Sequence, residues 1–244
     1  MIVDGIELDP NNLPKHIAII MDGNKRWAQE NSVSVMRGHR EGLERVIESL
    51  GVCEELGISV LTLFAFSTEN WKRSSKEISG LLKLFKYFFD REFKNLKKRN
   101  VKVLHSGLKK AFDKGVQKII DTMVDETKEN NRAILNLAIN YSGRLEIVEA
   151  VKSLIQQVKD HEMDVNELCE EHFSQCLFHP ELPEPDLLIR TSGEQRISNF
   201  LLWQTAYTEL YFTNILWPNF SRKDLLMAIS DYQGRERRYG GRSE

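Results

Sequence analysis

Short apolar runs and longer amphipathic segments alternate along the whole chain. Each short run is rich in β-branched residues and is bounded by polar or turn-forming residues, which is typical of a buried strand. The longer segments repeat their apolar positions every three or four residues, which is typical of a helix with one buried face. The predicted strands are 16–21, 60–67, 101–105, 133–141, 186–191 and 209–213. The predicted helices are 37–56, 76–99, 112–130, 144–160, 165–176 and 222–233.

The run 17–21 is apolar at every position. A strand that is apolar on both faces is expected where helices cover both sides of a sheet, and alternating strands and helices favour parallel pairing. We therefore predict a single α/β domain, with a mostly parallel central sheet of about six strands flanked by helices. We assign residues 16–241 to this domain and residues 1–15 to an N-terminal extension, because no repeat or linker divides the chain.

Charge and composition exclude several classes of protein. The 34 basic and 36 acidic residues leave a net charge of -2, which argues against a nucleic-acid-binding protein that relies on a bulk positive field. No apolar run reaches the roughly 18 residues that a membrane span needs, so no span is expected. Cys53, Cys169 and Cys176 lack a metal-ligand spacing and indicate reduced thiols.

The first predicted strand runs into Asp22-Gly23-Asn24-Lys25-Arg26-Trp27. This order resembles a phosphate loop with a metal ligand. Gly23 would let the backbone approach an anion closely, and the N–H groups at the start of the next helix favour negative charge. Asp22 could hold Mg²⁺, which takes one or two carboxylates together with phosphate oxygens. The alternative is an Asx-type turn in which Asp22 only caps a helix.

The second predicted strand also ends in polar groups. It delivers Ser67, Glu69 and Asn70, followed by an aromatic ring, Trp71, and a cation, Arg73. A helix entry capped by Ser67 or Thr68 would explain the hydroxyls. It would not explain Trp71 beside Arg73, so a functional site is the better hypothesis.

The apolar run 186–189 ends at Arg190, and Arg196 and Ser198 follow a short turn. A guanidinium group suits phosphate because its planar fork meets two oxygens at once. Ligands of open α/β sheets bind at the carboxyl ends of strands. The three strand ends together therefore predict a diphosphate site.

Three further features have two interpretations each. His39 follows Arg37-Gly38 and could face the first loop, protonated or as a hydrogen-bonding group, although a lone histidine there is more often structural. Glu209 is a second metal ligand or simply the first residue of a strand in solvent. The basic tail 234–242 covers an anion site, in its own subunit or in a partner's, or stays solvated.

Taken together, these residues resemble the cis-prenyltransferase family, of which undecaprenyl diphosphate synthase is the familiar member. The matching motifs lie at 21–28, 38–39, 66–71, 140–144, 186–204 and 217–220. The resemblance implies a parallel-sheet fold, a homodimer and Mg²⁺ as cofactor. It also implies isoprenoid diphosphates as substrates, such as dimethylallyl and isopentenyl diphosphate, joined with cis geometry.

The resemblance also implies roles for single residues. Asp22 would be the central catalytic carboxylate and Mg²⁺ ligand, with Glu209 completing the metal site. The allylic diphosphate would be held by Gly23, Asn24, Arg26 and His39, with Lys25 and Trp27 in the same loop. The second diphosphate would be held by Arg190, Arg196 and Ser198, assisted by Arg73. The reacting carbons would be positioned by Ser67, Glu69, Asn70 and Trp71, with Asn70 a candidate for proton removal.

The chain departs from the family pattern in its first pocket. Lys25 stands where most members have glycine, and Val35 where they have arginine, so Lys25 or Arg37 would supply the missing charge. Leu108 replaces an aspartate and Ser142 a glycine, and bulky side chains between 81 and 89 could plug a product tunnel. These departures favour a plant short-chain enzyme such as a lavandulyl diphosphate synthase, which couples two dimethylallyl diphosphates head to middle.

The alternative activity is regular cis-1'-4 condensation of isopentenyl diphosphate with an allylic diphosphate. Its product would be neryl, Z,Z-farnesyl or a longer polyprenyl diphosphate. A processed plant enzyme would reside in the plastid stroma, and any other member in the cytoplasm. A non-catalytic partner subunit would typically lack Asp22 and the arginines after the fifth strand. A generic phosphate-binding module would not explain the aromatic surroundings.

Overall fold

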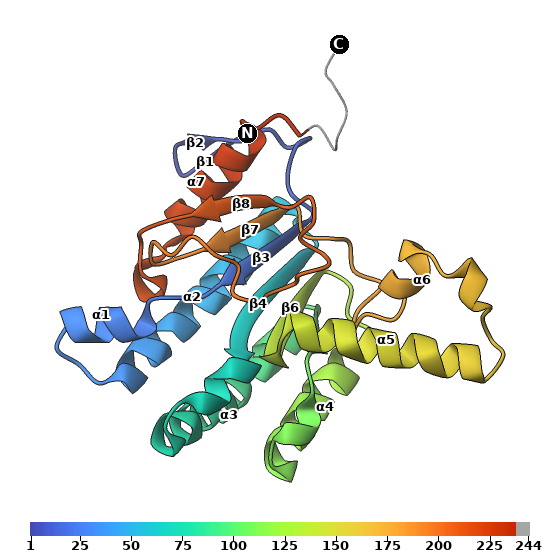
Figure 1. Ribbon diagram of the computed structural model, residues 1–244. Helices are drawn as coiled ribbons and strands as arrows, with labels where there is room; N and C mark the ends of the chain where they lie inside the picture. The colour runs from blue at the N-terminus through green and yellow to red at the C-terminus, as the bar shows by residue number, and fades with distance from the viewer. Residues whose placement is uncertain (238–244) are drawn as a thin grey trace.

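The central sheet in this computed structural model, which describes residues 1–237, has six parallel strands in the order β5-β6-β4-β3-β7-β8 (Figure 1). All five pairs of neighbouring strands are parallel. The predicted α/β domain with about six strands is therefore confirmed. The strands are β3 (His16–Ile20), β4 (Val60–Ser67), β5 (Val101–Ser106), β6 (Ala133–Tyr141), β7 (Leu187–Arg190) and β8 (Glu209–Phe212).

Helices connect these strands, and most lie within two residues of the predicted ranges. The α-helices are α1 (Asn24–Glu30), α2 (Val35–Leu56), α3 (Ser75–Lys98), α4 (Lys114–Thr127), α5 (Gly143–Lys159), α6 (Glu170–Ser174) and α7 (Arg222–Gln233). Short 3-10 turns are η1 (Thr68–Lys72), η2 (Lys109–Ala111), η3 (Val165–Glu167) and η4 (Trp217–Asn219). Ser34, Ser74 and Asp113 cap α2, α3 and α4 by accepting a hydrogen bond from the N–H group three residues ahead.

The prediction of one helix over 165–176 is wrong. The segment forms η3 and the five-residue α6, separated by Cys169 in an extended conformation. Its apolar residues Val165 and Leu168 are 61% and 46% exposed, so no core contact supports a longer helix. The short helix α1 was not among the predicted elements.

The N-terminal extension is folded against the domain. β1 (Ile2–Val3) and β2 (Ile6–Glu7) form an antiparallel hairpin that packs on α7. Leu8, directly after β2, is buried in the main hydrophobic cluster. The extension therefore contributes to the core rather than hanging free of it.

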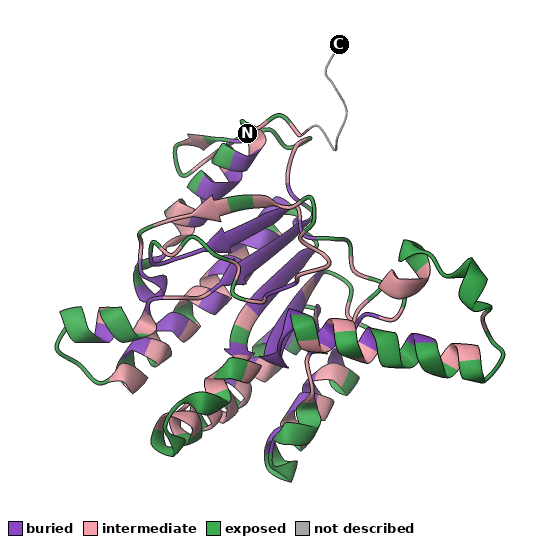
Figure 2. Ribbon diagram, in the orientation of Figure 1, coloured by how far each residue is buried: buried purple, intermediate pink, exposed green. Residues whose placement is uncertain are grey.

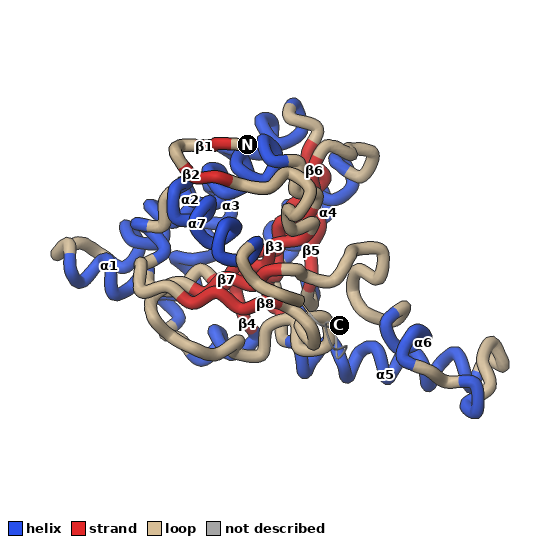
Figure 3. Tube along the Cα trace, turned by 90° about the horizontal axis from the view of Figure 1, so that it is seen from above, coloured by secondary structure: helices blue, strands red, loops and turns tan. Residues whose placement is uncertain are grey.

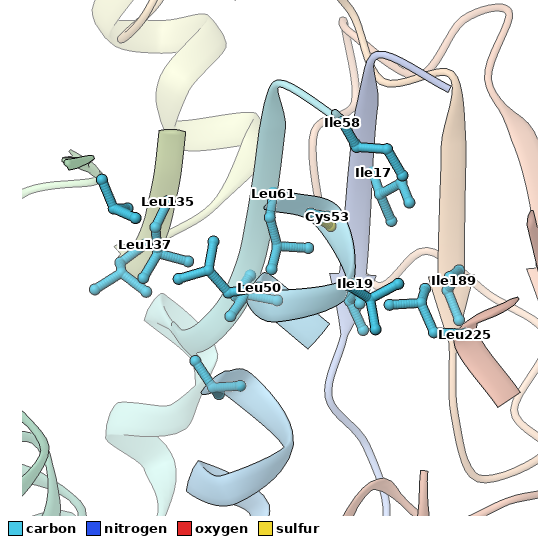
Figure 4. Packing of buried hydrophobic residues seen from close by; sticks show 14 of the residues in the cluster. Ile17, Ile19, Leu50, Cys53, Ile58, Leu61, Leu135, Leu137, Ile189 and Leu225 are labelled. Atoms are coloured by element: carbon cyan, nitrogen blue, oxygen red, sulfur yellow. The ribbon is translucent and has the colours of Figure 1, made fainter. Parts of the chain in front are cut away.

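Alternate residues of β3 serve two hydrophobic layers. Ile17 and Ile19 join the cluster that contains Leu50 of α2 and Leu225 of α7, and Figure 4 shows these side chains gathered on one side of the strands. The other face packs against the segment that follows β7, through residues such as Phe200. Figure 2 shows β3 and β7 within the buried centre of the molecule, which explains why their sequences are apolar at nearly every position. The edge strand β8 is partly exposed.

The neighbours of β3 are β4 on one side and β7 on the other, with Ile20 level with Phe64 and Arg190. The chain leaves the end of β3 for α1 and α2, whereas the chain leaving β7 returns across the opposite face. Such a switch point opens a crevice at the carboxyl ends of the strands. This crevice lies between the residues predicted to form the site.

Two elements project away from the sheet. Figures 1 and 3 both show α5 and α6 extending to one side of the molecule. Within residues 1–237, no helix combines the length and the apolar character that crossing a bilayer requires.

Candidate active site

Asp22 and Arg190 meet at the carboxyl ends of β3 and β7. Arg190 Nη2 donates to Asp22 Oδ2 at 2.8 Å, and Gly23 N–H donates to Asp22 Oδ1 at 2.7 Å. The Thr191 hydroxyl accepts from Asp22 N at 3.0 Å and donates to Asp22 O at 2.6 Å. The backbone of the first loop is therefore fixed to the end of β7.

Gly23 is required by this loop. Its φ is 109°, and a Cβ atom built on it would approach Leu216 Cα to 3.0 Å. An L-residue with a side chain rarely adopts this conformation, so another residue would displace the loop that carries Asp22.

Arg190 is a buried cation with an unused donor. Its Nη1 donates to Ser198 Oγ at 2.7 Å and to the Arg196 carbonyl at 2.5 Å. Its Nε is buried and has no hydrogen-bond partner among the described residues. A buried guanidinium that lacks part of its hydrogen bonding is suited to receive an anion.

The charge of Asp22 is stabilised by this arrangement. Burial alone would raise the pKa of the carboxyl group, but the hydrogen bond and charge of Arg190, with the Gly23 N–H group, hold the pKa below its ordinary value of 3.8. Asp22 is therefore ionised at neutral pH and available to a cation.

A cavity of about 980 Å³ opens at this pair and continues beneath the sheet edge. Its mouth carries polar side chains, including Asp22, Arg73 and Arg190. Its inner wall is apolar and comes from α2, α3, β4 and β6, with α4 contributing Val116. The apolar residues of this wall are Leu43, Val46, Leu63, Phe66, Leu81, Leu82, Leu84, Phe85, Phe88, Val116, Leu137 and Ile139, and six more apolar residues line the rest of the cavity: Ile20, Met21, Phe64, Ala65, Leu202 and Trp217.

Eleven of the sixteen predicted site residues line this cavity. They are Asp22, Gly23, Asn24, Lys25, His39, Ser67, Glu69, Asn70, Arg73, Arg190 and Ser198. The bulky residues of the 81–89 segment form walls of the cavity or core rather than a plug, and Tyr87 lies outside it, between Arg40 and Arg91.

Four predicted residues lie near the cavity but do not line it. Arg26 donates to Ser192 Oγ, and Trp27 Nε1 donates to Asn219 Oδ1. Trp71 Nε1 donates to Asn140 Oδ1, and the Trp71 ring packs against Phe66 and Phe112. Arg196 pairs with Glu194 at the surface, while its carbonyl accepts from Arg190. Their side chains support the site from outside in this structure.

Glu209 and Asp22 of the same chain lie too far apart to bind one metal ion together. Glu209 begins β8 level with Leu187, whereas Asp22 follows Ile20, which is level with Arg190. At about 3.3 Å per residue, roughly 10 Å of strand separates the two levels. Glu209 instead forms an ion pair of 2.9 Å with Arg235, as expected of a strand residue near the surface.

The described part of the basic tail lies at that same amino edge of the sheet. Besides pairing with Glu209, Arg235 pairs with Asp231 at 2.5 Å, and Arg237 lies 3.5 Å from Asp186. The tail thus leads away from Asp22 in its own subunit up to residue 237. The rest of the predicted 234–242 segment lies outside the described residues.

His39 lines the cavity as a neutral group. Burial, helped by the nearby positive charge of Arg73, lowers its pKa to about 4. At neutral pH it can therefore accept or donate a hydrogen bond but carries no charge. The lowered pKa therefore favours the hydrogen-bonding interpretation of His39 over the protonated one.

The end of β4 is both a helix cap and a part of the cavity, which are the two interpretations of its sequence. Ser67 caps η1, and Asn70 Oδ1 accepts from Ser67 N at 3.1 Å, which completes a capping box. Ser67, Glu69 and Asn70 nevertheless line the cavity. The cap therefore fixes these side chains at the mouth.

Lys25 and Arg37 are the two candidates to replace the positive charge of the arginine that is absent at position 35, and the structure distinguishes them. Lys25 lines the cavity. Arg37 does not, and it forms an ion pair of 2.7 Å with Glu41 on the surface of α2. Lys25 is therefore placed to supply the charge.

Two lining residues received no role from the sequence. Arg144 and Asn199 both lie at the mouth, and both belong to matching motifs, 140–144 and 186–204. The motifs provided the signal, but only the fold shows that these two positions meet.

The donor set fits a single Mg²⁺ ion held mainly by substrate. No group of three or more histidine, cysteine or acidic side chains suited to a metal occurs in the part of the chain that the structure describes. Asp22 is ionised and lines the cavity together with the cations Lys25, Arg73 and Arg190. One carboxylate with phosphate oxygens and water is the usual environment of Mg²⁺ in such sites.

Comparison with known sequences agrees with this geometry. The family model described as "Putative undecaprenyl diphosphate synthase" matches residues 20–240. A ditrans,polycis-undecaprenyl-diphosphate synthase ((2E,6E)-farnesyl-diphosphate specific) from Pasteurella multocida is 49% identical, over 98% of this chain and 100% of its own length. An isoprenyl transferase from Heliobacterium mobile is 46% identical, over 96% of this chain and 90% of its own.

Solved structures share the fold. Lavandulyl diphosphate synthase from Lavandula x intermedia, crystallised with dimethylallyl diphosphate, superposes with a TM-score of 0.92 at 35% identity, covering 94% of this chain and 99% of its own. A probable undecaprenyl diphosphate synthase from Campylobacter jejuni gives 0.80 at 34% identity, with the same two coverages. With most of the chain matched by family model, relatives and structures alike, the protein belongs to the undecaprenyl diphosphate synthase family and is a cis-prenyltransferase.

Proposed function

We propose that the enzyme performs regular cis-1'-4 condensation of isopentenyl diphosphate with an allylic diphosphate, releasing diphosphate and lengthening a polyprenyl chain. The observation that carries this proposal is the continuity of the anion site at Asp22 and Arg190 with the long apolar cavity. A growing hydrocarbon chain needs such a cavity, whereas the product of two five-carbon units would leave much of it unfilled.

The residues at the mouth suit the departure of diphosphate. Lys25 places positive charge where negative charge develops on the allylic leaving group. The apolar wall below keeps water from the allylic cation that remains. Mg²⁺, when bound at Asp22, would offset further charge on the phosphate oxygens.

The second half-site would hold isopentenyl diphosphate. Arg190 and Ser198 line the cavity and are suited to its diphosphate, with Arg73 nearby. Asn70 is the proposed group at the proton-removal step, because its cap places it at the mouth close to Glu69.

Head-to-middle coupling is the second candidate function. It is favoured by the close superposition on lavandulyl diphosphate synthase and by Val35 in the first pocket. The relatives named above as isoprenyl transferase or undecaprenyl diphosphate synthase are more similar in sequence, at 46% and 49% identity against 35%, and favour regular condensation.

The deciding experiment is an incubation with defined substrates and Mg²⁺. Dimethylallyl diphosphate is supplied alone, then with isopentenyl diphosphate, and farnesyl diphosphate is then tested as the allylic substrate. We expect linear cis products only when isopentenyl diphosphate is present. A branched ten-carbon product from dimethylallyl diphosphate alone would reject regular condensation.

We also propose a homodimer that forms through α5. Val148, Val151 and Ile155 are exposed and spaced by three and four residues, so they form one apolar stripe on α5. Figure 1 shows this helix projecting from the sheet. The two sequence relatives reported above, at 46% and 49% identity, are bacterial, so the expectation of a plant enzyme in a plastid loses its support.

A further inference from the structure

The segment 196–202 follows β7 in the chain and contacts the start of α5 in space. Three of its residues have an unusual backbone conformation. Ser198, Asn199 and Leu201 have φ values of 49°, 65° and 45°, although none of them is glycine. Residues with side chains occupy this region at a cost, and they remain there only where surrounding contacts hold them. Asn199 makes four hydrogen bonds to other parts of the chain.

The Asn199 side chain uses its whole amide group. Its Oδ1 accepts from Arg144 N at 2.9 Å, and its backbone carbonyl accepts from Gly143 N at 2.8 Å. These are two of the N–H groups that the start of α5 cannot satisfy within the helix. Asn199 therefore caps α5 from a distant part of the chain.

The other end of the amide reaches across the mouth of the cavity. Asn199 Nδ2 donates to Glu69 Oε1 at 2.8 Å and to Ser142 Oγ at 2.6 Å. The opposite orientation would place Oδ1 against the Glu69 carboxylate and Nδ2 against an N–H group. The hydrogen-bond network therefore determines which end is nitrogen.

These contacts link two parts of the site that belong to different strands. Glu69 follows β4, whereas Ser198, the residue before Asn199, accepts from Arg190 Nη1 at 2.7 Å beyond the end of β7. β3 lies between β4 and β7 in the sheet. Asn199 thus spans the end of β3 and sets how far Ser198 and Arg190 stand from Glu69.

We propose that Asn199 is a positioning residue, which holds the Arg190–Ser198 pair in register with Glu69 for the second diphosphate substrate. This proposal rests on the proposed function. The first pocket is built on Asp22, Lys25 and His39, and none of these is hydrogen-bonded to Asn199 among the described residues. Loss of the amide should therefore affect isopentenyl diphosphate more than the allylic substrate.

The test compares Asn199→Asp and Asn199→Gly with the unmodified enzyme at pH 8 and pH 6. In Asn199→Asp, two carboxylates face each other at hydrogen-bond distance and retain a proton more readily than either would alone. We expect the KM for isopentenyl diphosphate to rise about tenfold at pH 8, with a lower kcat, because small misplacements of substrate are costly. The KM for the allylic substrate should change less than about twofold.

The pH dependence separates hydrogen bonding from folding. At pH 6 the shared proton restores a donor, so the defect of Asn199→Asp, relative to the unmodified enzyme at that pH, should shrink severalfold. Asn199→Gly tolerates the positive φ but has no amide, so its defect should be the same at both pH values. If Asn199→Asp fails to fold, the KM comparison in Asn199→Gly still decides the proposal.

Asn100 provides the matched control. It has a similar φ of 60°, and its Nδ2 donates to Asn131 Oδ1 at 2.8 Å in an exposed turn before β5. Asn100→Asp and Asn100→Gly should leave both KM values unchanged. An unchanged KM for isopentenyl diphosphate in both Asn199 variants, or equal losses for both substrates without pH dependence, would overturn the proposal. Absence of prenyl transfer by the unmodified enzyme would reject the proposed function instead.

Discussion

At the scale of single residues, the site depends on a buried arginine and a half-buried carboxylate that stabilise each other. Arg190 has little exposure and would be costly to bury alone, and the Asp22 carboxylate supplies the opposite charge at 2.8 Å. The same contact keeps Asp22 ionised. An arginine is needed here, because its fork spans Asp22, Ser198 and a carbonyl at once, which a lysine ammonium could not do.

Replacing Asp22 should therefore abolish most of the activity. We expect Asp22→Ala to lower kcat by about 10²- to 10⁴-fold, because it removes the proposed Mg²⁺ ligand and leaves Arg190 without its partner. Steady-state kinetics over a range of Mg²⁺ concentrations measures the loss, and circular dichroism checks the fold. Asp90→Asn, on the exposed face of α3, is the control and should be fully active. Near-normal turnover of Asp22→Ala would contradict the assigned role.

Buried histidines make stability depend on pH. Burial lowers the pKa of His16 to about 4, partly offset by its hydrogen bond to the Pro183 carbonyl. Its folded pKa lies below the unfolded value of 6.5, so the neutral histidine contributes stability above pH 6.5, and that contribution is lost as the pH falls towards 4. At pH 5 the loss amounts to about 2 kcal/mol for this one group.

Urea unfolding at pH 7 and pH 5 measures this effect. His16→Gln should lose less free energy of unfolding between the two pH values than the unmodified protein does. His161→Gln, which replaces an exposed histidine, should show the unmodified dependence. Identical pH dependence in all three proteins would show that His16 does not take up the proton.

At the scale of elements, α3 has two functions that its sequence alone does not separate. It contributes Leu96 to the core and presents Leu81, Leu84 and Phe85 to the cavity. Both roles require apolar residues at helical spacing. The depth of the cavity is therefore set by which turn of the helix faces it.

A larger side chain on this face should shorten the product. We expect Leu84→Trp to stop chain growth earlier, because the added ring occupies space that the hydrocarbon chain would fill. Chromatography of the dephosphorylated products gives their lengths. Met227→Trp, on the exposed side of α7, should leave the distribution unchanged. Products of unmodified length from Leu84→Trp would show that the chain does not grow along α3.

At the scale of the whole molecule, the proposed dimer accounts for an element that the monomer leaves exposed. α5 begins at the site through Ser142 and Arg144 and then projects beyond the sheet, where it packs on α6 (Figure 3). An apolar stripe on such a helix is typical of a surface that is buried in an assembly.

A charge in the stripe should separate the subunits. We expect Val151→Glu to shift the protein from dimer to monomer in size-exclusion chromatography with light scattering, because the interface would have to bury an unpaired carboxylate. Met227→Glu is the control for an exposed apolar residue elsewhere. A monomeric unmodified protein, or a dimeric Val151→Glu variant, would reject α5 as the interface.

The sequence by itself determined the sheet and most of the site. Strands that are apolar on both faces are hard to mistake, so β4 and β6 were predicted at their observed bounds. Parallel pairing then places every strand's carboxyl end at one edge, which is why Asp22, Asn70 and Arg190 could be grouped before their contacts were known.

The tertiary structure decided what depends on register and on distant contacts. Glu209 lies at the opposite edge because it begins its strand, and the segment 165–176 fails as one helix because Val165 and Leu168 in its first half are exposed and make no core contact. Lys25 rather than Arg37 faces the cavity, and Asn199 reaches Glu69 only through a backbone that local propensity would not select. Periodicity specifies which residues are buried, but the partner of a polar side chain is fixed only when the chain has folded.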